Sequence, residues 1–126
     1  MTTEVRNQFQ TLLRDFGDGW SSGDGAKIGA LFVEDGVFLP DPFGAEIRGR
    51  AAIEDYWKDV PQEQSEIAFR SGEVHSVGPW FSVEFKCTFR RRRTGEPVDV
   101  RGAIFCETTE GLIQEMRLYY HRNVGA

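Results

Sequence analysis

The hydrophobic pattern changes its period near residue 64, and this change limits the chain to folds that combine helices with a sheet. Before residue 64, apolar residues recur about every 3.6 residues, as they do on one face of a helix. After it, apolar and polar residues alternate, as they do along a half-buried strand. Helices followed by a run of long strands predict an α+β fold, in which a curved, mainly antiparallel sheet packs on the helices.

Three helices are expected in the first half of the chain. The first spans about residues 3–20 and stops at the Ser21-Ser22-Gly23 sequence. Asp24 caps a short second helix, which ends at Asp35-Gly36. The third spans about residues 50–60, and Pro61 closes it. The residues expected to face the core from the second and third helices are Ile28, Leu31, Phe32, Ala52, Ile53, Tyr56 and Trp57.

Strands account for the rest of the pattern. The pattern predicts two short paired strands, at residues 36–39 and 46–48. It also predicts a long central strand that contains residues 81–89, with three further long strands at residues 66–77, 98–108 and 112–122. The central strand points these residues to the core: Phe81, Val83, Phe85, Cys87 and Phe89. The outer face of the sheet is expected to carry Trp80, Ser82, Glu84, Lys86, Ile104 and Cys106. Cys87 and Cys106 would then lie on opposite faces, which excludes a disulfide between them.

One carboxylate, Asp41, stands between two prolines in an otherwise apolar run. Pro40 and Pro42 fix the backbone φ angle and keep this turn out of the interior of a helix or central strand. A stiff, apolar frame around an ionisable group raises the pKa of a carboxylate and suits a general base. An exposed turn aspartate is the alternative, because Asp and Pro are common turn formers.

The length and composition of the chain favour one globular domain that covers residues 1–126. A net charge of −5 argues against a nucleic-acid partner. No apolar run approaches the roughly 18 residues that cross a bilayer, and the first residues lack a signal peptide, so we expect a cytoplasmic protein without a membrane segment. The sequence contains no metal-ligand spacing, nucleophile–base motif or glycine-rich phosphate loop, so no metal or cofactor is expected.

Four consecutive arginines, Arg90 to Arg93, lead into a turn at Gly95. We favour a solvated hairpin tip, because charged residues at such a place protect the edge of a sheet. An anionic ligand or partner is the alternative interpretation of the same four residues.

Three segments carry a resemblance to a known family: LFVEDGVFLPDPFG at 31–44, IRGRAAIEDYW at 47–57 and GLIQEMRLYY at 111–120. Over nearly the whole chain the sequence resembles the nuclear-transport-factor-2-like superfamily, in its SnoaL-like and ketosteroid-isomerase-like branch. The resemblance implies a cystatin-like, cone-shaped α+β barrel with an apolar pocket between helices and sheet. It also implies a homodimer formed through the outer face of the sheet.

The DPFG sequence at 41–44 is similar to a ketosteroid isomerase motif, whose aspartate abstracts a proton beside a carbonyl. Asp41 stands at that place. The same resemblance puts Phe16 and Ala103 where those isomerases carry their two oxyanion donors, and losing one donor typically slows a reaction about a hundred- to a thousandfold. Tyr120, Arg101 and Trp57 are then the candidate donors, with Arg101 expected on the pocket face of its strand. Arg101 could instead pair with Asp41 or Asp99, and His75 could work with Asp41 as in related dehydratases.

The candidate catalytic residues are therefore Asp41, Tyr120 and Arg101. The pocket is expected to be lined by Phe16, Trp20, Tyr56, Trp57, Phe85, Cys87, Phe89, Ala103, Phe105, Met116 and Leu118. Its ligand would be a small hydrophobic or cyclic carbonyl compound. Two functions stay open: an isomerase or lyase that uses acid–base chemistry without a cofactor, such as a dehydratase or cyclase, and a binding protein that keeps the pocket without catalysis.

Overall fold

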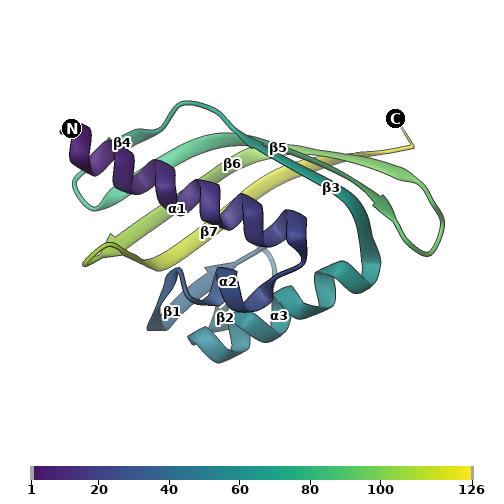
Figure 1. Cartoon of the computed structure of the whole chain (residues 1–126), viewed down its shortest axis with the longest axis horizontal. Coiled ribbons are helices and arrows are strands. Elements are labelled where there is room, and N and C mark those ends of the chain that lie inside the picture. Colours follow the sequence, from purple (N-terminus) through teal and green to yellow (C-terminus); the bar gives the residue numbers. More distant parts are fainter. Residues whose placement is uncertain (1, 126) are drawn as a thin grey trace.

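A computed structural model describes residues 2–125, which form three helices and one seven-stranded sheet. The helices are α1 (Thr3–Ser22), α2 (Gly25–Gly29) and α3 (Arg50–Glu63). The strands are β1 (Phe32–Leu39), β2 (Ile47–Arg48), β3 (Gln64–Ser71), β4 (His75–Val77), β5 (Trp80–Arg91), β6 (Pro97–Thr109) and β7 (Leu112–Val124). The strand order is β2-β1-β7-β6-β5-β3, with β4 also paired to β5, and only β1 and β7 run parallel (Figure 1).

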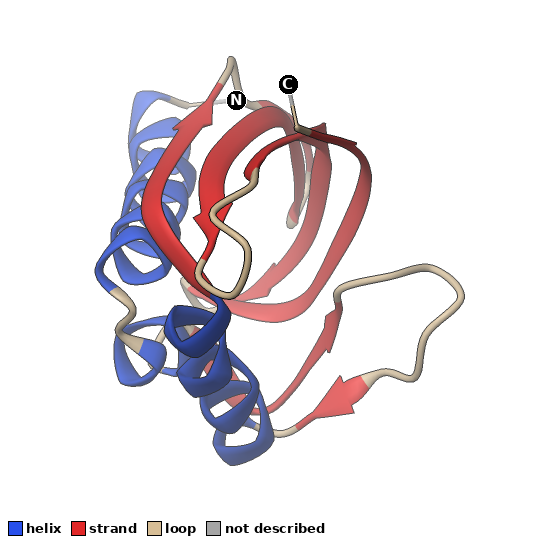
Figure 2. Ribbon diagram, turned by 90° about the vertical axis from the view of Figure 1, so that its right-hand side faces the viewer, coloured by secondary structure: helices blue, strands red, loops and turns tan. Residues whose placement is uncertain are grey.

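The sheet curls strongly, and the helices pack on one side of it (Figure 2). This arrangement confirms the expected α+β cone, and its core lies between α1, α3 and the concave face of the sheet. Phe16 on α1 is fully buried there, with its ring against Trp20, Trp57 and Phe69. None of the helices among residues 2–125 is both long and apolar enough to cross a membrane.

The ends of the helices follow local capping rules, although two boundaries differ from those expected. Gly23 ends α1 in the left-handed region, with φ 69°, and the Asp24 carboxylate caps α2 by accepting from the Lys27 N–H. The α2 helix ends at Gly29, so the expected extension to Asp35-Gly36 was wrong, because those residues belong to β1. The α3 helix continues past Pro61, whose carbonyl accepts from Arg92 Nε at 2.6 Å.

Two further expectations for the first half and the middle of the chain need correction. Ala52 is exposed and Tyr56 is 38% exposed, so α3 buries only Ile53 and Trp57 fully. The strand expected at 66–77 is two strands, β3 and β4, which both pair with β5. The short pairing between β1 and residues 47–48 is confirmed.

The two faces of the sheet are occupied as expected on β5 but not on β6. Every inward residue expected on β5, from Phe81 to Phe89, is buried. On β6 the buried residues are Val98, Val100, Ile104 and Cys106, so the face assignment of this strand was wrong. Asp99, Arg101, Ala103, Phe105 and Glu107 share the opposite, outer face, because side chains alternate along a strand.

The two cysteines therefore lie on the same face, and the argument against a disulfide changes. Cys87 and Cys106 are both fully buried and unpaired with each other. Cys106 pairs across the sheet with Phe81, which precedes Cys87 on β5 by six residues. That separation is about 20 Å at a rise of about 3.3 Å per residue, far beyond the reach of a disulfide.

Candidate functional site

A small cavity lies between α3, the end of α1 and the concave face of the sheet. Its volume is about 90 Å³. We call it the inner cavity, and its lining consists of Trp20, Pro40, Tyr56, Trp57, Val60, Gln64, Phe85, Phe89, Val100, Leu118, Tyr120 and Arg122. Aromatic and aliphatic side chains dominate this lining, so the cavity favours an apolar guest.

Two tryptophans of the inner cavity differ in how their indole nitrogens are satisfied. Trp20 Nε1 donates to Gln64 Oε1 at 2.9 Å, which links the end of α1 to the start of β3. Trp57 Nε1 is buried and has no hydrogen-bond partner, alone among the buried side-chain polar atoms of residues 2–125. A buried donor without a partner costs about 1–3 kcal/mol relative to a satisfied one, so an acceptor brought next to this atom would stabilise the protein.

Two tyrosines add hydroxyl groups to the same cavity. Burial raises the pKa of the Tyr56 phenol, and the neighbouring Tyr120 and Glu63 raise it further. Tyr56 is therefore an O–H donor at neutral pH, because a raised phenol pKa favours the protonated form. Tyr120 lies on β7 two residues beyond Leu118 and also lines the cavity, as the two-residue period of this strand predicts.

Asp41 lies outside the inner cavity. It is exposed, and its Oδ1 accepts from the N–H of Phe43 at 2.8 Å, which shapes the turn after β1. Figure 2 shows the loop between β1 and β2 projecting from the body of the molecule. Together with Tyr120 and Arg122 this turn lines an outer hollow of about 570 Å³, whose remaining lining residues are Pro42, Phe43, Tyr119 and His121.

The inner cavity and the outer hollow share Tyr120 and Arg122, so they meet at the end of β7. The reason lies in the sheet. The last register partner of β1 on β7 is Arg117, opposite Leu39, so within residues 2–125 the part of β7 beyond it pairs with no strand on that side. The chain turns away at Pro40, which lines the inner cavity, and Asp41, which lines the outer hollow.

Arg101 is outside both spaces, which corrects its expected position. Its side chain is on the exposed face of β6 and donates to both carboxylate oxygens of Asp99, at 3.2 and 3.0 Å. The hydrogen bond from Arg101 lowers the pKa of Asp99. The pairing of Arg101 with Asp99, one of the two structural alternatives for this residue, is therefore the arrangement present. Ala103 and Phe105 share this outer face, and Phe105 contacts Tyr119 edge to face.

The other expected pocket residues divide into two groups. The inner cavity is lined by Trp20, Tyr56, Trp57, Phe85, Phe89, Leu118 and Tyr120. The remaining three, Phe16, Cys87 and Met116, are completely buried and are not part of its lining. Five lining residues were missed: Pro40, Val60, Gln64, Val100 and Arg122. The signal for Arg122 was the two-residue spacing after Leu118 and Tyr120, whereas only a three-dimensional contact could bring Gln64 to Trp20.

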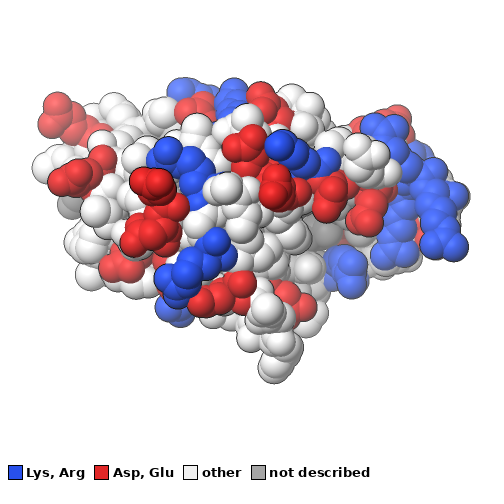
Figure 3. All heavy atoms as spheres, turned by 90° about the horizontal axis from the view of Figure 1, so that it is seen from below, with Lys and Arg blue, Asp and Glu red and all other residues white. Residues whose placement is uncertain are grey.

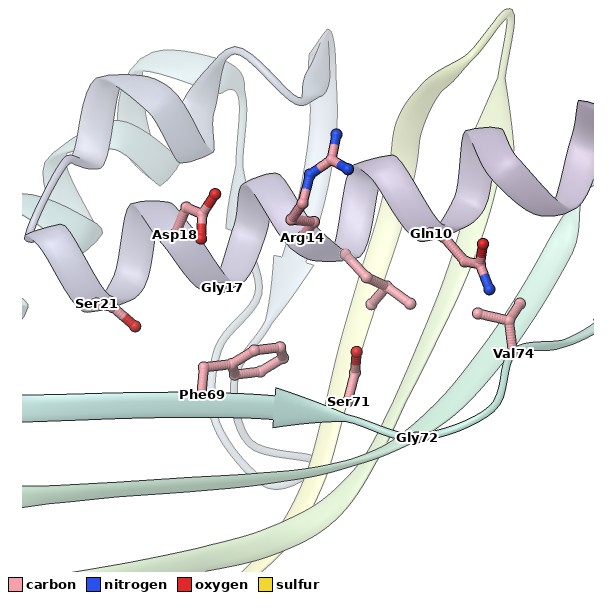
Figure 4. A pocket seen from close by; sticks show the side chains of 10 residues that line it. Gln10, Arg14, Gly17, Asp18, Ser21, Phe69, Ser71, Gly72 and Val74 are labelled. Atoms are coloured by element: carbon pink, nitrogen blue, oxygen red, sulfur yellow. The ribbon is translucent and has the colours of Figure 1, made fainter.

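A second, larger groove lies between α1 and β3. Its volume is about 360 Å³, and its lining is Gln10, Leu13, Arg14, Gly17, Asp18, Ser21, Phe69, Ser71, Gly72 and Val74. Figure 4 shows Asp18 and Arg14 on the helix and Phe69 and Ser71 on the strand side. None of its lining residues is among those with an unpaired buried polar atom, so the inner cavity is the stronger candidate for a specific site.

Titratable groups do not cluster as a metal site in the described part of the chain. No group of three or more His, Cys, Asp or Glu side chains among residues 2–125 has the proximity needed to hold a metal ion. His75 is exposed on β4 and lines a shallow outer hollow with Trp80 and Phe105, whereas Asp41 lines a different one.

Comparison with known proteins adds the family. Residues 13–116 match the sequence pattern of the SnoaL-like domain. No curated protein sequence matches the chain significantly.

Among solved structures, a provisionally described isomerase from Bacillus subtilis is 27% identical, with a TM-score of 0.81 over 91% of this chain and 87% of that one. The epoxide hydrolase/cyclase-like enzyme SalBIII, which has a role in pyran ring formation in salinomycin, is 17% identical, with a TM-score of 0.82 over 98% and 99%. A Catenulispora acidiphila protein with a ketosteroid isomerase-like fold, in complex with trimethylamine, is 18% identical, with a TM-score of 0.80 over 86% and 84%.

Proposed function

The chain belongs to the SnoaL-like domain family, and from this premise we propose that its inner cavity binds a small, largely apolar molecule that carries a hydrogen-bond acceptor. The observation that carries this proposal is that Trp57, whose buried Nε1 has no partner, lines a cavity walled by aromatic and aliphatic side chains. A carbonyl oxygen at Trp57 would satisfy this donor, and the ring of the ligand would contact Phe85 and Leu118.

The size of the cavity limits the part of the ligand that it holds. About 90 Å³ corresponds to roughly three water molecules at about 30 Å³ each. An apolar cavity of about 150 Å³ binds benzene, so without movement of its walls the inner cavity holds part of a ring, and the rest of the ligand would extend past Tyr120 toward the outer hollow. Apolar contacts with the walls would supply most of the affinity, whereas the bond to Trp57 would select ligands with an acceptor.

Binding of acetophenone and ethylbenzene, measured by two-dimensional NMR titration, tests the proposal. The two molecules differ mainly in the carbonyl, so wild type should bind acetophenone about three- to tenfold more tightly, as expected for a hydrogen bond worth about 0.5–1.5 kcal/mol. Trp57→Phe keeps a ring and removes the donor, so the preference should disappear. Trp80→Phe is the matched control, because Trp80 stacks under Arg117 outside the inner cavity. Failure of both molecules to shift inner-cavity signals would refute the proposal.

A second candidate function is proton abstraction beside a carbonyl, with Asp41 as the general base and Tyr120 as a donor to the developing oxyanion. It is favoured by one observation: both residues line the outer hollow, which meets the inner cavity at Tyr120. Conjugation of a β,γ-unsaturated ketone, followed by absorbance, tests it. We expect a rate above buffer that Asp41→Asn lowers by at least a hundredfold. An unchanged rate in Asp41→Asn would remove Asp41 from this role.

We also propose that two copies associate through the outer face of the sheet. Phe105 and Tyr119 form an exposed aromatic pair on this face, 41% and 40% exposed, and Trp80 lies nearby under Arg117. Aromatic residues and arginine are enriched at protein interfaces. Sedimentation should show a dimer at micromolar concentration that Phe105→Glu dissociates. A monomeric wild type would contradict this interface without affecting the inner cavity.

A further inference from the structure

The polar groups of the inner cavity share one property: each can donate a hydrogen bond. They are the indole N–H groups of Trp20 and Trp57, the hydroxyls of Tyr56 and Tyr120, the amide of Gln64 and the guanidinium of Arg122. No Asp or Glu is part of the lining. Since Gln64 Oε1 already accepts from Trp20, the side-chain acceptors left are the two hydroxyl oxygens. Such a site favours a ligand that is rich in acceptors or negatively charged.

Arg122 stands out among the arginines that line a hollow. Arg14 lines the groove between α1 and β3, Arg117 lines a hollow beside Leu39, and Arg122 lines the inner cavity and the outer hollow. Arg14 has Asp15 as a partner at 4.0 Å, and Arg117 has Glu115 at 2.7 Å. Arg122 takes part in none of the ion pairs that residues 2–125 form. Its positive charge therefore lies outside these ion pairs, where the inner cavity meets the outer hollow.

The surroundings of Arg122 strengthen its attraction for an anion. Arg122 pairs across the sheet with Val100. Val100 lies only a few residues from the β5–β6 hairpin, where the arginines 90–93 occupy the end of β5 and the start of the turn. Figure 3 shows Lys and Arg side chains gathered at the end of the molecule where this hairpin turns. Some of these charges are paired, as Arg90 is with Glu66. Clustered charge of one sign near a cleft raises the local concentration of ligands of the opposite sign.

We infer that the site takes an apolar carboxylate, whose apolar end enters the inner cavity and whose carboxylate binds Arg122 where the inner cavity meets the outer hollow. The inference rests on the proposed function and adds the chemical class of the ligand. A guanidinium binds a carboxylate through two parallel hydrogen bonds, which fixes orientation as well as charge. Tyr120 also lines both spaces and offers a hydroxyl to the same group. An acceptor at the other end of the ligand reaches Trp57.

Asp41 gives the inference a second, independent consequence. It lines the outer hollow with Arg122, so its negative charge faces the space into which the carboxylate would project. Like charges repel, and the repulsion between groups near a protein surface is weakened by salt. Asp41→Asn removes this charge and keeps the shape, so it should tighten binding of the carboxylate while leaving a neutral ligand unaffected.

The test compares 4-acetylbenzoate with its methyl ester. Both carry the ketone and the ring, and only the first carries the charge. Affinities from isothermal titration should favour the carboxylate about tenfold at low salt, and the preference should shrink as salt is raised. Arg122→Gln should abolish the preference and leave the affinity for the ester unchanged. Arg101→Gln is the matched control, because it removes the same charge from the outer face of the neighbouring strand, opposite His121.

The possible results separate the inference from the proposed function. If the ester binds and the carboxylate binds no better, the ligand class is wrong while the inner cavity remains a binding site. If neither compound binds, the proposed function fails with it. Phenyltrimethylammonium serves as the probe of opposite charge, and tighter binding of this cation than of 4-acetylbenzoate would overturn the inference. An equal loss of carboxylate affinity in Arg101→Gln would also overturn it, because the effect would then be one of net charge.

Discussion

Trp20 and Trp57 pack edge to face, with their ring centroids 5.3 Å apart, yet only the indole of Trp20 has a hydrogen-bond partner. Both rings are almost fully buried, at 6% and 3% exposure, so water does not explain the difference. Both side chains line the inner cavity, and Trp57 keeps a buried N–H group without an acceptor.

This contrast predicts different effects of the same substitution at two neighbouring positions. Trp20→Phe should destabilise the fold more than Trp57→Phe, because it breaks a bond and leaves Gln64 Oε1 without its donor. We expect a difference of about 1–3 kcal/mol in the free energy of unfolding, measured with urea. Both variants lose a similar ring volume, so each controls for the other. Equal destabilisation would show that the Trp57 donor is satisfied in solution.

A second prediction concerns the close approach of β6 and β7 at Gly102. A Cβ atom at Gly102 would meet the carbonyl oxygen of Tyr119 and lie 2.7 Å from the Cα of Tyr120. These are backbone atoms that cannot rotate away, so Gly102→Ala should cost at least the roughly 1–3 kcal/mol typical of overpacking. It should also displace Tyr120 and weaken ligand binding. In Gly72→Ala the nearest atom lies at an ordinary 3.6 Å, and unchanged stability is expected from thermal unfolding of this control.

A third prediction concerns the contact between α1 and β3 at the groove of Figure 4. Gly17 faces Phe69, and an added Cβ atom would collide with the ring. Alanine normally favours a helix over glycine by about 1 kcal/mol, so a destabilising Gly17→Ala would show that the collision outweighs this preference. Phe69→Leu should restore part of the loss. A double-mutant cycle by urea unfolding measures this coupling, and a value near zero would contradict the contact.

The fold was predictable because a helical hydrophobic period in the first half of the chain gives way to a strand period in the second. The two faces of β5 were also predicted correctly. The apolar residues from Phe81 to Phe89 occupy every second position without interruption. On β6 the equivalent signal was Val98, Val100, Ile104 and Cys106. The family resemblance placed Ala103 in the pocket and so reversed the strand, although burial of two valines and an isoleucine outweighs one alanine.

The site was harder to predict because it depends on contacts distant in sequence. Trp57 was expected to line the pocket. That its indole N–H has no hydrogen-bond acceptor depends on the positions of all the surrounding groups, which the sequence does not give. Gln64 accepts a hydrogen bond from Trp20, which is 44 positions away in sequence, and no local sequence pattern predicts this hydrogen bond. Arg122 lay within the pattern of β7 and was overlooked because a charged residue near a strand end usually faces solvent.

The last prediction follows from the two buried thiols. Burial raises the pKa of Cys87 to about 12 and also raises that of Cys106. A thiol in the unfolded chain titrates near 9, so above this pH the unfolded state loses protons that the native state keeps. Because the unfolded state then binds fewer protons, the free energy of unfolding should fall as pH rises from about 9 toward 12, by roughly 1.4 kcal/mol per pH unit for each thiol.

Urea unfolding at pH 8 and pH 10 of wild type and the Cys87→Ala/Cys106→Ala variant isolates this effect from other groups that titrate at alkaline pH. The variant is less stable at both pH values, because each substitution leaves a small cavity. Its decline in stability between the two should nevertheless be smaller than that of wild type by about 2–3 kcal/mol. Identical declines, or rapid labelling of native wild type by iodoacetamide at pH 8, would show that the thiols are accessible in the folded state.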